Sequence, residues 1–383
     1  MPRNIAFFAD GTWNGTDPND ENRDGIADLT NVLKMFCSLE GAQTLDTTRL
    51  QDEQELVARD AGGAVVQHAK YIHGVGDSRN PLMRVLGGVF GAGIIQRIVR
   101  GYTFISRNYR RGDRIFITGF SRGAYTARAL GGLIAEVGLL DPQMLDLDDR
   151  IDGYRYGISA WVRYRRAAGK VDLSLDSLEQ TEGKSIPDGA LITGVLIEAI
   201  GVWDTVGSLG LPFYIRDQRY DLFKFADTTL SPRVAHGIHA LSIDELRGDF
   251  APTFWNAAAN VTQAAFIGAH SDVGGGYAER GLSDIALGWM RDELKAAGLQ
   301  FLPNPAYQPD PRGLQDMHEP WNESLFRIGV QMPREFPGPE AMALHDSVRL
   351  RVAALPGYRP QSLIDSGYMD AAGNFNPSVR FVP

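Results

Sequence analysis

DRIFITGFSRGAYTARALGGLIAEV, residues 113–137, combines a short apolar run, a Gly-x-Ser-x-Gly turn and a helix-like pattern. The apolar run at 115–117 suits a buried strand. After the turn, four apolar residues follow the spacing of one helix face: Leu130, Leu133, Ile134 and Val137. Gly138 is expected to end this helix. A strand, a sharp turn and a helix in this order are the pattern of a nucleophile elbow, so Ser121 is a candidate nucleophile.

The two glycines of the turn support this interpretation. Gly119 and Gly123 flank Ser121 and allow a turn that few side chains could enter, which would lift the hydroxyl above the C-terminal edge of a sheet. A chain with 43 glycines can produce this motif by accident. The flanking strand and helix are therefore what favour a serine hydrolase over an ordinary glycine-rich turn.

Composition indicates a soluble globular enzyme. The 383 residues are 44% hydrophobic and 22% charged, and the net charge of −9 argues against a nucleic-acid binder and against attraction to anionic lipid. Cys37 is the only cysteine, which excludes an internal disulfide and a thiolate metal cluster. The N-terminal apolar stretch is too short for a signal peptide, and no run of about 18 apolar residues occurs. We expect a cytoplasmic protein in the producing cell.

Strand-like and helix-length segments alternate along the chain. The strand-like runs are 5–9, 66–72, 115–118, 196–203 and 264–267, and the helix-length segments include 92–110, 122–137 and 283–297. This alternation predicts an α/β fold of the α/β-hydrolase type, with a mostly parallel central sheet flanked by helices and long insertions. We expect one elaborated domain over 1–383, with a possible lid insertion at 141–190 and a C-terminal extension at 299–383.

Residues 151–170 interleave aromatic and basic side chains, in the order IDGYRYGISAWVRYRRAAGK. This composition suits a lid or a contact with a membrane interface. A helix that packs on the body of the protein with its arginines in solvent explains it slightly better.

Polar residues follow each strand-like run, where a parallel sheet collects its chemistry. These positions hold Asp10-Gly11-Thr12, His73-Gly74, Ser121, Asp204 and His270. A serine hydroxyl needs a base to take its proton, and the base needs an acid to orient it. The order Ser121, Asp204, His270 is that of α/β-hydrolases. The sequence therefore predicts this catalytic triad.

Other residues compete for the same roles. His73 is the second candidate for the base, and Asp272 and Asp244 are alternatives for the acid. Asp272 has another explanation as a brace for its own loop, GAHSDVGGGY, because aspartates readily bond nearby backbone amides. His236 and His239 are three residues apart in a predicted helix and could bind a metal, but no third ligand supports them, so we assign them a surface or core role.

An oxyanion hole requires backbone amides aimed at the developing negative charge. The amide of Arg122, directly after the nucleophile, is the first expected donor. Gly11 or Thr12 is the candidate for the second, although Asp10-Gly11 is also an ordinary turn dipeptide.

Two further motifs carry less information. Asp20-x-Asn22-x-Asp24-Gly25 opens like a calcium loop, but Asn31 stands where a bidentate glutamate belongs, so an acidic surface turn is favoured over a calcium site. LGGVFGAG at 86–93 lacks the full spacing of a dinucleotide fingerprint, and we interpret it as a loop that shapes an acyl pocket or precedes a helix. No required cofactor is expected.

Six blocks of the chain resemble the catalytic domain of the type VI secretion lipase effectors of the first class. They are DGTWN at 10–14, YIHGVGD at 71–77, GFSRGAYTAR at 119–128, GVWDTVGS at 201–208, HALSIDE at 239–245 and HSDVGGGY at 270–277. The family pattern also matches Ser121, Asp204 and His270 to the triad. The resemblance implies a phospholipase A that releases fatty acid from glycerophospholipids, export by a type VI system, and a delivery or immunity partner.

The chain departs from that family in one respect. Family members often carry a membrane-anchoring or accessory module, whereas the residues after the last block contain several prolines and few apolar runs. Peripheral membrane contact, a plain carboxylesterase and a lipase that depends on a partner for delivery therefore stay open. Two further alternatives are an acyltransferase and a non-catalytic binding protein on the same fold, although the intact set of three triad residues argues against the latter.

Overall fold

The structure is a computed structural model of the 383-residue chain. It describes residues 2–11, 29–41, 53–73, 88–169, 173–206, 214–215, 218–219, 228–322 and 331–383. Thr12, Gly74 and the acidic motif at 20–25 lie outside the described residues. So do parts of three of the six sequence blocks noted above and the start of the glycine-rich segment at 86–93.

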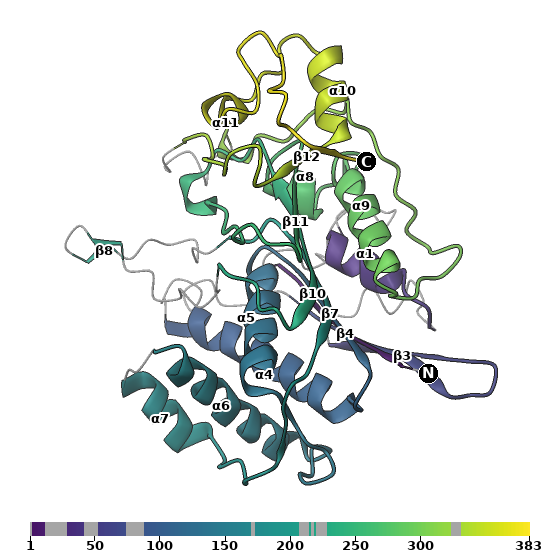
Figure 1. The fold of residues 1–383 in the computed structure, drawn as a ribbon, viewed down its shortest axis with the longest axis vertical. Coiled ribbons are helices and arrows are strands. Elements are labelled where there is room, and N and C mark those ends of the chain that lie inside the picture. Colours follow the sequence, from purple (N-terminus) through teal and green to yellow (C-terminus); the bar gives the residue numbers. More distant parts are fainter. Residues whose placement is uncertain are drawn as a thin grey trace.

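In the described part of the chain, one nine-stranded sheet forms the centre, in the order β13-β12-β11-β10-β7-β4-β1-β3-β2 (Figure 1). Its strands are β1 (Asn4–Ala9), β2 (Gln54–Arg59), β3 (Val65–Ile72), β4 (Arg114–Phe120), β7 (Ile197–Trp203), β10 (Val234–Ser242), β11 (Val261–Phe266), β12 (Ala343–His345) and β13 (Phe381–Val382). All neighbours pair in parallel except β2 and β3, which are antiparallel. The predicted mostly parallel α/β fold is confirmed.

Helices cover both faces of the sheet (Figure 1). The longer ones are α1 (Asn31–Cys37), α4 (Gly88–Asn108), α5 (Arg122–Val137), α6 (Arg150–Ala167), α7 (Leu173–Glu182), α9 (Ser283–Ala296) and α10 (Asp346–Ala354). Shorter elements are α8 (His270–Gly274), α11 (Gln361–Asp365), η1 (Gly248–Phe250), η2 (Pro320–Asn322) and the small antiparallel pairs β5 (Leu139–Leu140) with β6 (Leu191–Ile192) and β8 (Tyr214–Ile215) with β9 (Gln218–Arg219). No helix within the described residues combines the length and apolar character that a bilayer-spanning segment needs.

Alternating residues of the central strands separate two hydrophobic cores. Ile5 and Phe7 of β1 belong to a core shared with α4, α5 and α6, whereas Ala6 and Phe8 belong to the core shared with α1 and α9. All six residues of β1 are buried. Successive side chains of a strand point to opposite faces, so a strand covered on both faces appears as a continuous apolar run.

Residues 151–167 of the aromatic and basic segment lie in helix α6, which begins after its N-cap Asp149. Tyr156, Trp161 and Tyr164 are buried, and the neighbouring helices include α4 and α5. Arg163 and Arg166 are exposed. The segment is therefore a helix packed on the body, and a role as a lid stays a prediction.

The sequence interpretation was wrong about residues 234–242. These residues form strand β10, not a helix, and lie between β7 and β11. The three-residue spacing of His236 and His239 suggested a helix, but in a strand the same spacing places them on opposite faces. His239 is fully buried and His236 is exposed, so the first lies in the core and the second on the surface.

Candidate active site

Ser121 lies at a sharp turn between strand β4 and helix α5, as the elbow pattern predicts. Its backbone has φ 57° and ψ −121°, in a region that residues other than glycine rarely adopt. Its N–H donates to the Trp203 carbonyl over 3.1 Å, and its hydroxyl does not cap helix α5. The strain of this turn is thus held by the neighbouring strand β7, and the hydroxyl is not used by the helix that follows it.

The two glycines of the elbow are needed for close packing of backbone on backbone. A Cβ atom on Gly119 would lie 2.2 Å from the Gly123 carbonyl oxygen. One on Gly123 would lie 2.0 Å from the Ala9 carbonyl oxygen. Both distances are far shorter than any van der Waals contact, so the glycines let β1, β4 and α5 meet at the turn.

Register brings the strand ends together at one edge of the sheet. Phe120 of β4 pairs with Trp203 of β7, so Ser121 and Asp204 leave the sheet as neighbours. On the other side of β4, Ala9 pairs with both Gly119 and Ile72, which places Asp10 and His73 at the same edge. His270 follows strand β11, whose Phe266 pairs with Ser242 of β10. All five polar strand exits predicted from the sequence therefore lie on the C-terminal edge.

Asp204 and His270 form a short buried pair. His270 Nδ1 and Asp204 Oδ2 are 2.5 Å apart, and the two residues are 4% and 0% exposed. Asp204 also has a positive φ of 40°, and within the described ranges only Ser121 shares this feature among residues other than glycine. Two such strained residues side by side on adjacent strands indicate a functional site.

The pKa values of this pair fit a carboxylate beside a neutral imidazole. Burial alone would raise the pKa of Asp204, but the Arg334 guanidinium and the hydrogen bond with His270 hold it well below its usual range. Burial lowers the pKa of His270, against the opposing effect of Asp204. At neutral pH, His270 is therefore uncharged and able to accept a proton.

Besides His270, two groups bind the Asp204 carboxylate, and one histidine binds the backbone of the next residue. The Ser242 N–H donates to Oδ1 over 2.9 Å. Arg334 donates to Oδ1 over 2.7 Å and to Oδ2 over 2.9 Å. The next amide, of Thr205, donates to His239 Nε2 over 3.1 Å. His239 thus supports the turn after Asp204, and Arg334 is a site residue that the sequence analysis missed.

No local signal could have identified Arg334. It lies 130 residues from Asp204, outside every motif and after the last of the six blocks. A buried aspartate at a strand exit does require a partner, but the partner's position in the chain depends on tertiary structure.

His270 begins the short helix α8, not the loop that its glycine-rich surroundings suggested. Its N–H donates to Glu245 Oε2 over 3.2 Å. The Phe120 and Phe250 rings pack against the imidazole at centroid distances of 4.6 Å and 5.0 Å. The ring is therefore held by the elbow on one side and by the segment after β10 on another.

The alternative acids have other partners. Asp244 Oδ2 accepts from the Gly268 N–H over 2.7 Å and from the Tyr358 hydroxyl over 2.8 Å, and burial raises its pKa to about 6. Asp272 Oδ2 accepts from the Ala269 N–H over 3.0 Å, and Oδ1 lies 2.7 Å from His318 Nδ1. Both carboxylates brace the loops around His270, and Asp204 is the one placed against its ring.

Asp10 organises the turn after strand β1. It is buried, and its carboxylate accepts from the Gly11 N–H over 2.6 Å, the Thr30 hydroxyl over 2.7 Å and the Tyr71 hydroxyl over 2.5 Å. Burial raises its pKa in spite of these bonds. Gly11 lies against the elbow, because a Cβ on it would be 3.4 Å from that of Ser121. Its amide is close to the nucleophile but is engaged by Asp10.

Arg122 and His73 complete the candidates considered from sequence. Arg122 is the first residue of α5, where a helix amide has no acceptor within the helix. Burial, with a smaller effect of Arg97, lowers the pKa of its side chain to about 9. The ring of His73 packs on Tyr71 at a centroid distance of 4.9 Å, beside Asp10 and not beside Asp204.

Among the described residues, no group of three or more His, Cys, Asp or Glu side chains is arranged to hold a metal ion. Asn31, the last position of the calcium-like motif, donates from its side chain to the carbonyls of Val273 and Ser283, both over 2.9 Å. It ties α1 to the α8–α9 region. Cys37 is buried, and burial raises the pKa of its thiol to about 12.

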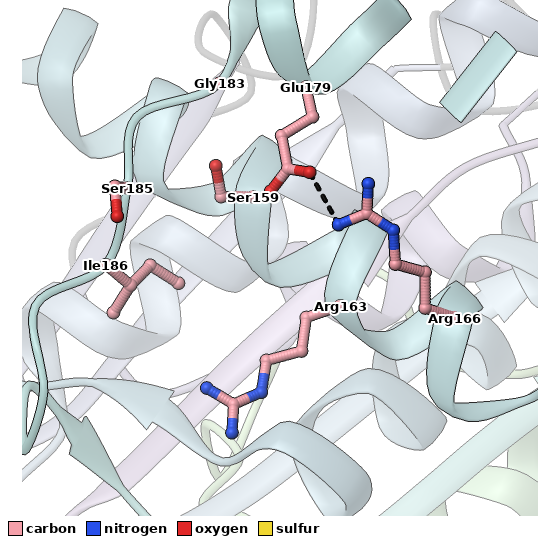
Figure 2. A pocket seen from close by; sticks show the side chains of 7 residues that line it. All are labelled: Ser159, Arg163, Arg166, Glu179, Gly183, Ser185 and Ile186. Atoms are coloured by element: carbon pink, nitrogen blue, oxygen red, sulfur yellow. Dashed lines mark ion pairs between the residues drawn. The ribbon is translucent and has the colours of Figure 1, made fainter. Parts of the chain in front are cut away.

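A separate pocket lies on the outer side of α6, against α7 and the segment after it (Figure 2). Figure 2 shows Arg166 directed toward Glu179, at 2.6 Å, whereas Arg163 extends away from this pair. Arg166 also contacts Asp176 at 2.7 Å. None of the strand-exit residues lines this pocket, and the charge of Arg166 is already balanced by two carboxylates.

Comparison with known proteins finds one matching family model, described as "T6SS, Phospholipase effector Tle1-like, catalytic domain", over residues 3–293. A curated relative, the uncharacterized protein YEL023C of Saccharomyces cerevisiae, is 28% identical over 252 residues, which is 65% of this chain and 32% of the yeast protein. The chain thus spans about a third of that relative.

Two solved structures are similar at 18% identity each. An uncharacterized protein from Pseudomonas aeruginosa gives a TM-score of 0.42, with 79% of this chain and 46% of that chain covered. The Tle1 effector bound to the VgrG spike from the type 6 secretion system gives a TM-score of 0.36, with 72% and 51% covered. The chain spans about half of each.

Proposed function

The chain belongs to the T6SS phospholipase effector family with a Tle1-like catalytic domain, and from this premise we propose that it is a serine hydrolase of glycerophospholipid acyl esters. The observation that supports this most directly is the 2.5 Å contact between His270 and Asp204 beside the strained Ser121. In the proposed triad Ser121 is the nucleophile, His270 the general base and Asp204 the acid that orients it.

The proposed reaction follows from the bonding of the imidazole. Asp204 binds Nδ1 of His270, which leaves Nε2 to take the proton of the Ser121 hydroxyl as its oxygen attacks the acyl carbonyl. The tetrahedral intermediate then collapses, and the lysophospholipid leaves with that proton. Water attacks the acyl-enzyme in the same way, which releases the fatty acid and restores the serine. This chemistry uses no cofactor.

We assign the first oxyanion donor to the amide of Arg122, at the N-terminus of helix α5. The second is proposed to come from the turn at Gly11 and Thr12. Because the Gly11 amide already donates to Asp10 over 2.6 Å, it would have to share that bond with an oxyanion. We therefore expect the Gly11 amide to stabilise the oxyanion less than the Arg122 amide of the elbow does.

The substrate class and partners are proposed from the family. We propose phospholipase A activity, which releases fatty acid and leaves a lysophospholipid, together with delivery by a type VI system and an immunity partner in the producing cell. Contact with the bilayer would then be peripheral.

The deciding experiment incubates phospholipid vesicles with the wild-type protein, with Ser121→Ala and with Ser185→Ala as a matched control at an exposed serine. We expect the wild type and the control to release fatty acid and lysophospholipid, in the presence of a metal chelator as well, and Ser121→Ala to release neither. Cleavage of a short soluble ester alone would replace phospholipase A by carboxylesterase. Inactivity of the wild type on both substrates would overturn the hydrolase proposal.

A further inference from the structure

We propose that Arg334 is a positioning residue of the proposed triad. It fixes the rotamer of Asp204, and because His270 binds the same carboxylate, the negative charge of Asp204 is divided between Arg334 and His270. This inference rests on the proposed function. The family match ends at residue 293. The proposal therefore gives the part of the chain after that match a role in the site.

Both terminal nitrogens of the Arg334 guanidinium donate two hydrogen bonds each. One terminal nitrogen, Nη1, donates to Asp204 Oδ1 over 2.7 Å and to the Ser242 carbonyl over 2.9 Å. The other, Nη2, donates to Asp204 Oδ2 over 2.9 Å and to the Phe250 carbonyl over 2.7 Å. Arg334 therefore binds both carboxylate oxygens and is anchored on the backbone at both ends of its fork. A lysine carries the same charge but cannot make this planar, two-armed contact.

Asp204 needs such a partner. It is fully buried and holds a positive φ of 40°, so neither solvent nor a relaxed backbone keeps its side chain in place. Apart from Arg334, its carboxylate has the Ser242 amide on Oδ1 and His270 on Oδ2. These two bonds would still permit the carboxylate to rotate, whereas the bidentate contact defines its plane.

The charge of Arg334 also bears on protonation of His270. The charged groups that act on the imidazole are Asp204 and Glu245, which favour its charged form, and Arg247, which opposes it. Arg334 reaches the imidazole through Asp204 Oδ2, which it shares with His270. Arg247 is bound to Glu245 at 2.7 Å, so those two largely offset each other. Arg334 offsets Asp204 in the same way. Removal of Arg334 leaves Asp204 free to stabilise the imidazolium, and His270 then becomes protonated at a higher pH.

The test measures kcat and KM for a short soluble ester across the pH range in which histidine titrates, for wild type, Arg334→Gln and Arg334→Lys. Arg351→Gln is the matched control. Arg351 is 4% exposed against 5% for Arg334, lies in the same C-terminal segment, and donates to the backbone carbonyls of Gly313 and Gln315. Thermal unfolding of every variant shows the temperature at which all are folded for the assay.

We expect Arg334→Gln to lose on the order of 100-fold in kcat with KM little changed, because a small misplacement of a catalytic group costs about that much. The acidic limb of its profile of kcat against pH should move to higher pH. Arg334→Lys should lose kcat while its acid limb stays close to that of wild type, because the charge is kept and the fork is lost. Arg351→Gln should keep both kcat and the acid limb.

Three outcomes would overturn the proposal: wild-type kcat in Arg334→Lys, an unmoved acid limb in folded Arg334→Gln, or the same losses in the Arg351→Gln control. If Arg334→Gln does not fold, the kcat of Arg334→Lys decides the question: a loss supports the proposal, and a wild-type value overturns it. Absence of Ser121-dependent hydrolysis in the wild type would refute the proposed function instead. In that case an NMR titration of the His270 ring in wild type, Arg334→Gln and Arg334→Lys still tests the effect on its protonation. We expect a higher pKa in Arg334→Gln and a value close to that of wild type in Arg334→Lys, and equal titrations of wild type and Arg334→Gln would refute that.

Discussion

Residues 3–293 and residues 299–383 contribute to the candidate site in different ways. The first region matches the family model and places Ser121, Asp204 and His270 at neighbouring strand ends. The second region adds strands β12 and β13 to the edge of the sheet next to β11. The side chains of the proposed triad thus come from one region, and the other region completes its sheet.

The C-terminal region also holds three carboxylates of the first region. Arg334 binds Asp204, Tyr358 binds Asp244 at 2.8 Å, and His318 binds Asp272 at 2.7 Å. All three aspartates lie after strands β7, β10 and β11 or in the helix that follows. Sequence motifs thus mark the proposed catalytic groups, whereas the groups that fix them lie in a segment without motifs.

The largest expected effect separates two of these carboxylates. Asp204→Asn should leave folding intact and reduce kcat/KM by roughly 10⁴-fold, because an asparagine favours the wrong imidazole tautomer. Asp244→Asn, at a half-buried carboxylate that the C-terminal region also binds, should change turnover little. Steady-state kinetics on a soluble ester measure both. Normal turnover in Asp204→Asn would move the acid to Asp244 or Asp272.

A glycine in each region gives the next comparison. Gly123→Ala should cost about 1–3 kcal/mol of unfolding free energy or more, because its Cβ would meet the Ala9 carbonyl oxygen at 2.0 Å. The gain of roughly 1 kcal/mol from alanine in a helix cannot offset that clash. Gly357→Ala, where a Cβ meets nothing within 4 Å, should be close to neutral. Urea unfolding monitored by circular dichroism tests both, and equal stabilities would show that the elbow has room to relax.

Much of the first region could be predicted from its residues. Buried parallel strands are continuous apolar runs, so β1, β3, β4, β7 and β11 were found, and their order along the chain placed Ser121, Asp204 and His270 at strand exits. Strand β10 was mistaken for a helix because two histidines three residues apart have a helical spacing. Strands β12 and β13 have three and two residues, too few to show any periodicity.

The site was predicted less completely than the fold. The pairing of His270 with Asp204 was predicted from the residue types at the strand exits and their order along the chain, with Asp272 and Asp244 as alternative acids. Arg334, Tyr358 and His318 could not be predicted, because hydrogen-bond partners of buried carboxylates are chosen by tertiary contacts over long sequence separations. Their segment has several prolines and few apolar runs, which led us to expect little of it.

A pH profile sharpens the comparison further. Burial lowers the pKa of His270, and the base must be neutral to act, so kcat/KM should fall only when the pH drops below that lowered value. We therefore expect the acid limb of the wild type below the ordinary histidine pKa of about 6.5. The limb of Arg334→Gln should lie above that of wild type. An acidic limb above pH 6.5 in the wild type would mean that Asp204 has a larger effect than burial on the pKa of the imidazole.

The smallest expected effect concerns His318, which the C-terminal region places on Asp272. The hydrogen bond that His318 donates to the Asp272 carboxylate outweighs burial and raises the pKa of His318 in the folded protein. A raised pKa stabilises the fold below the unfolded value of about 6.5, and this contribution is lost as the pH rises through the higher folded value. His318→Gln should therefore cost less than about 1 kcal/mol at acidic pH, since the side chain is 26% exposed, and almost nothing at alkaline pH.

His345 in the same region provides a control of opposite sign. Burial lowers its pKa to about 4, so the wild type loses stability as the pH falls below about 6.5 and the unfolded chain takes up a proton that the folded one refuses. His345→Gln should consequently gain stability relative to wild type at acidic pH, where His318→Gln loses it. Urea unfolding of the three proteins at acidic and alkaline pH measures both differences. If His318→Gln had the same stability as the wild type at every pH, the ion pair of His318 with Asp272 would contribute nothing to the fold. The contacts of the C-terminal region that stabilise the surroundings of His270 would then be those of Arg334 and Tyr358.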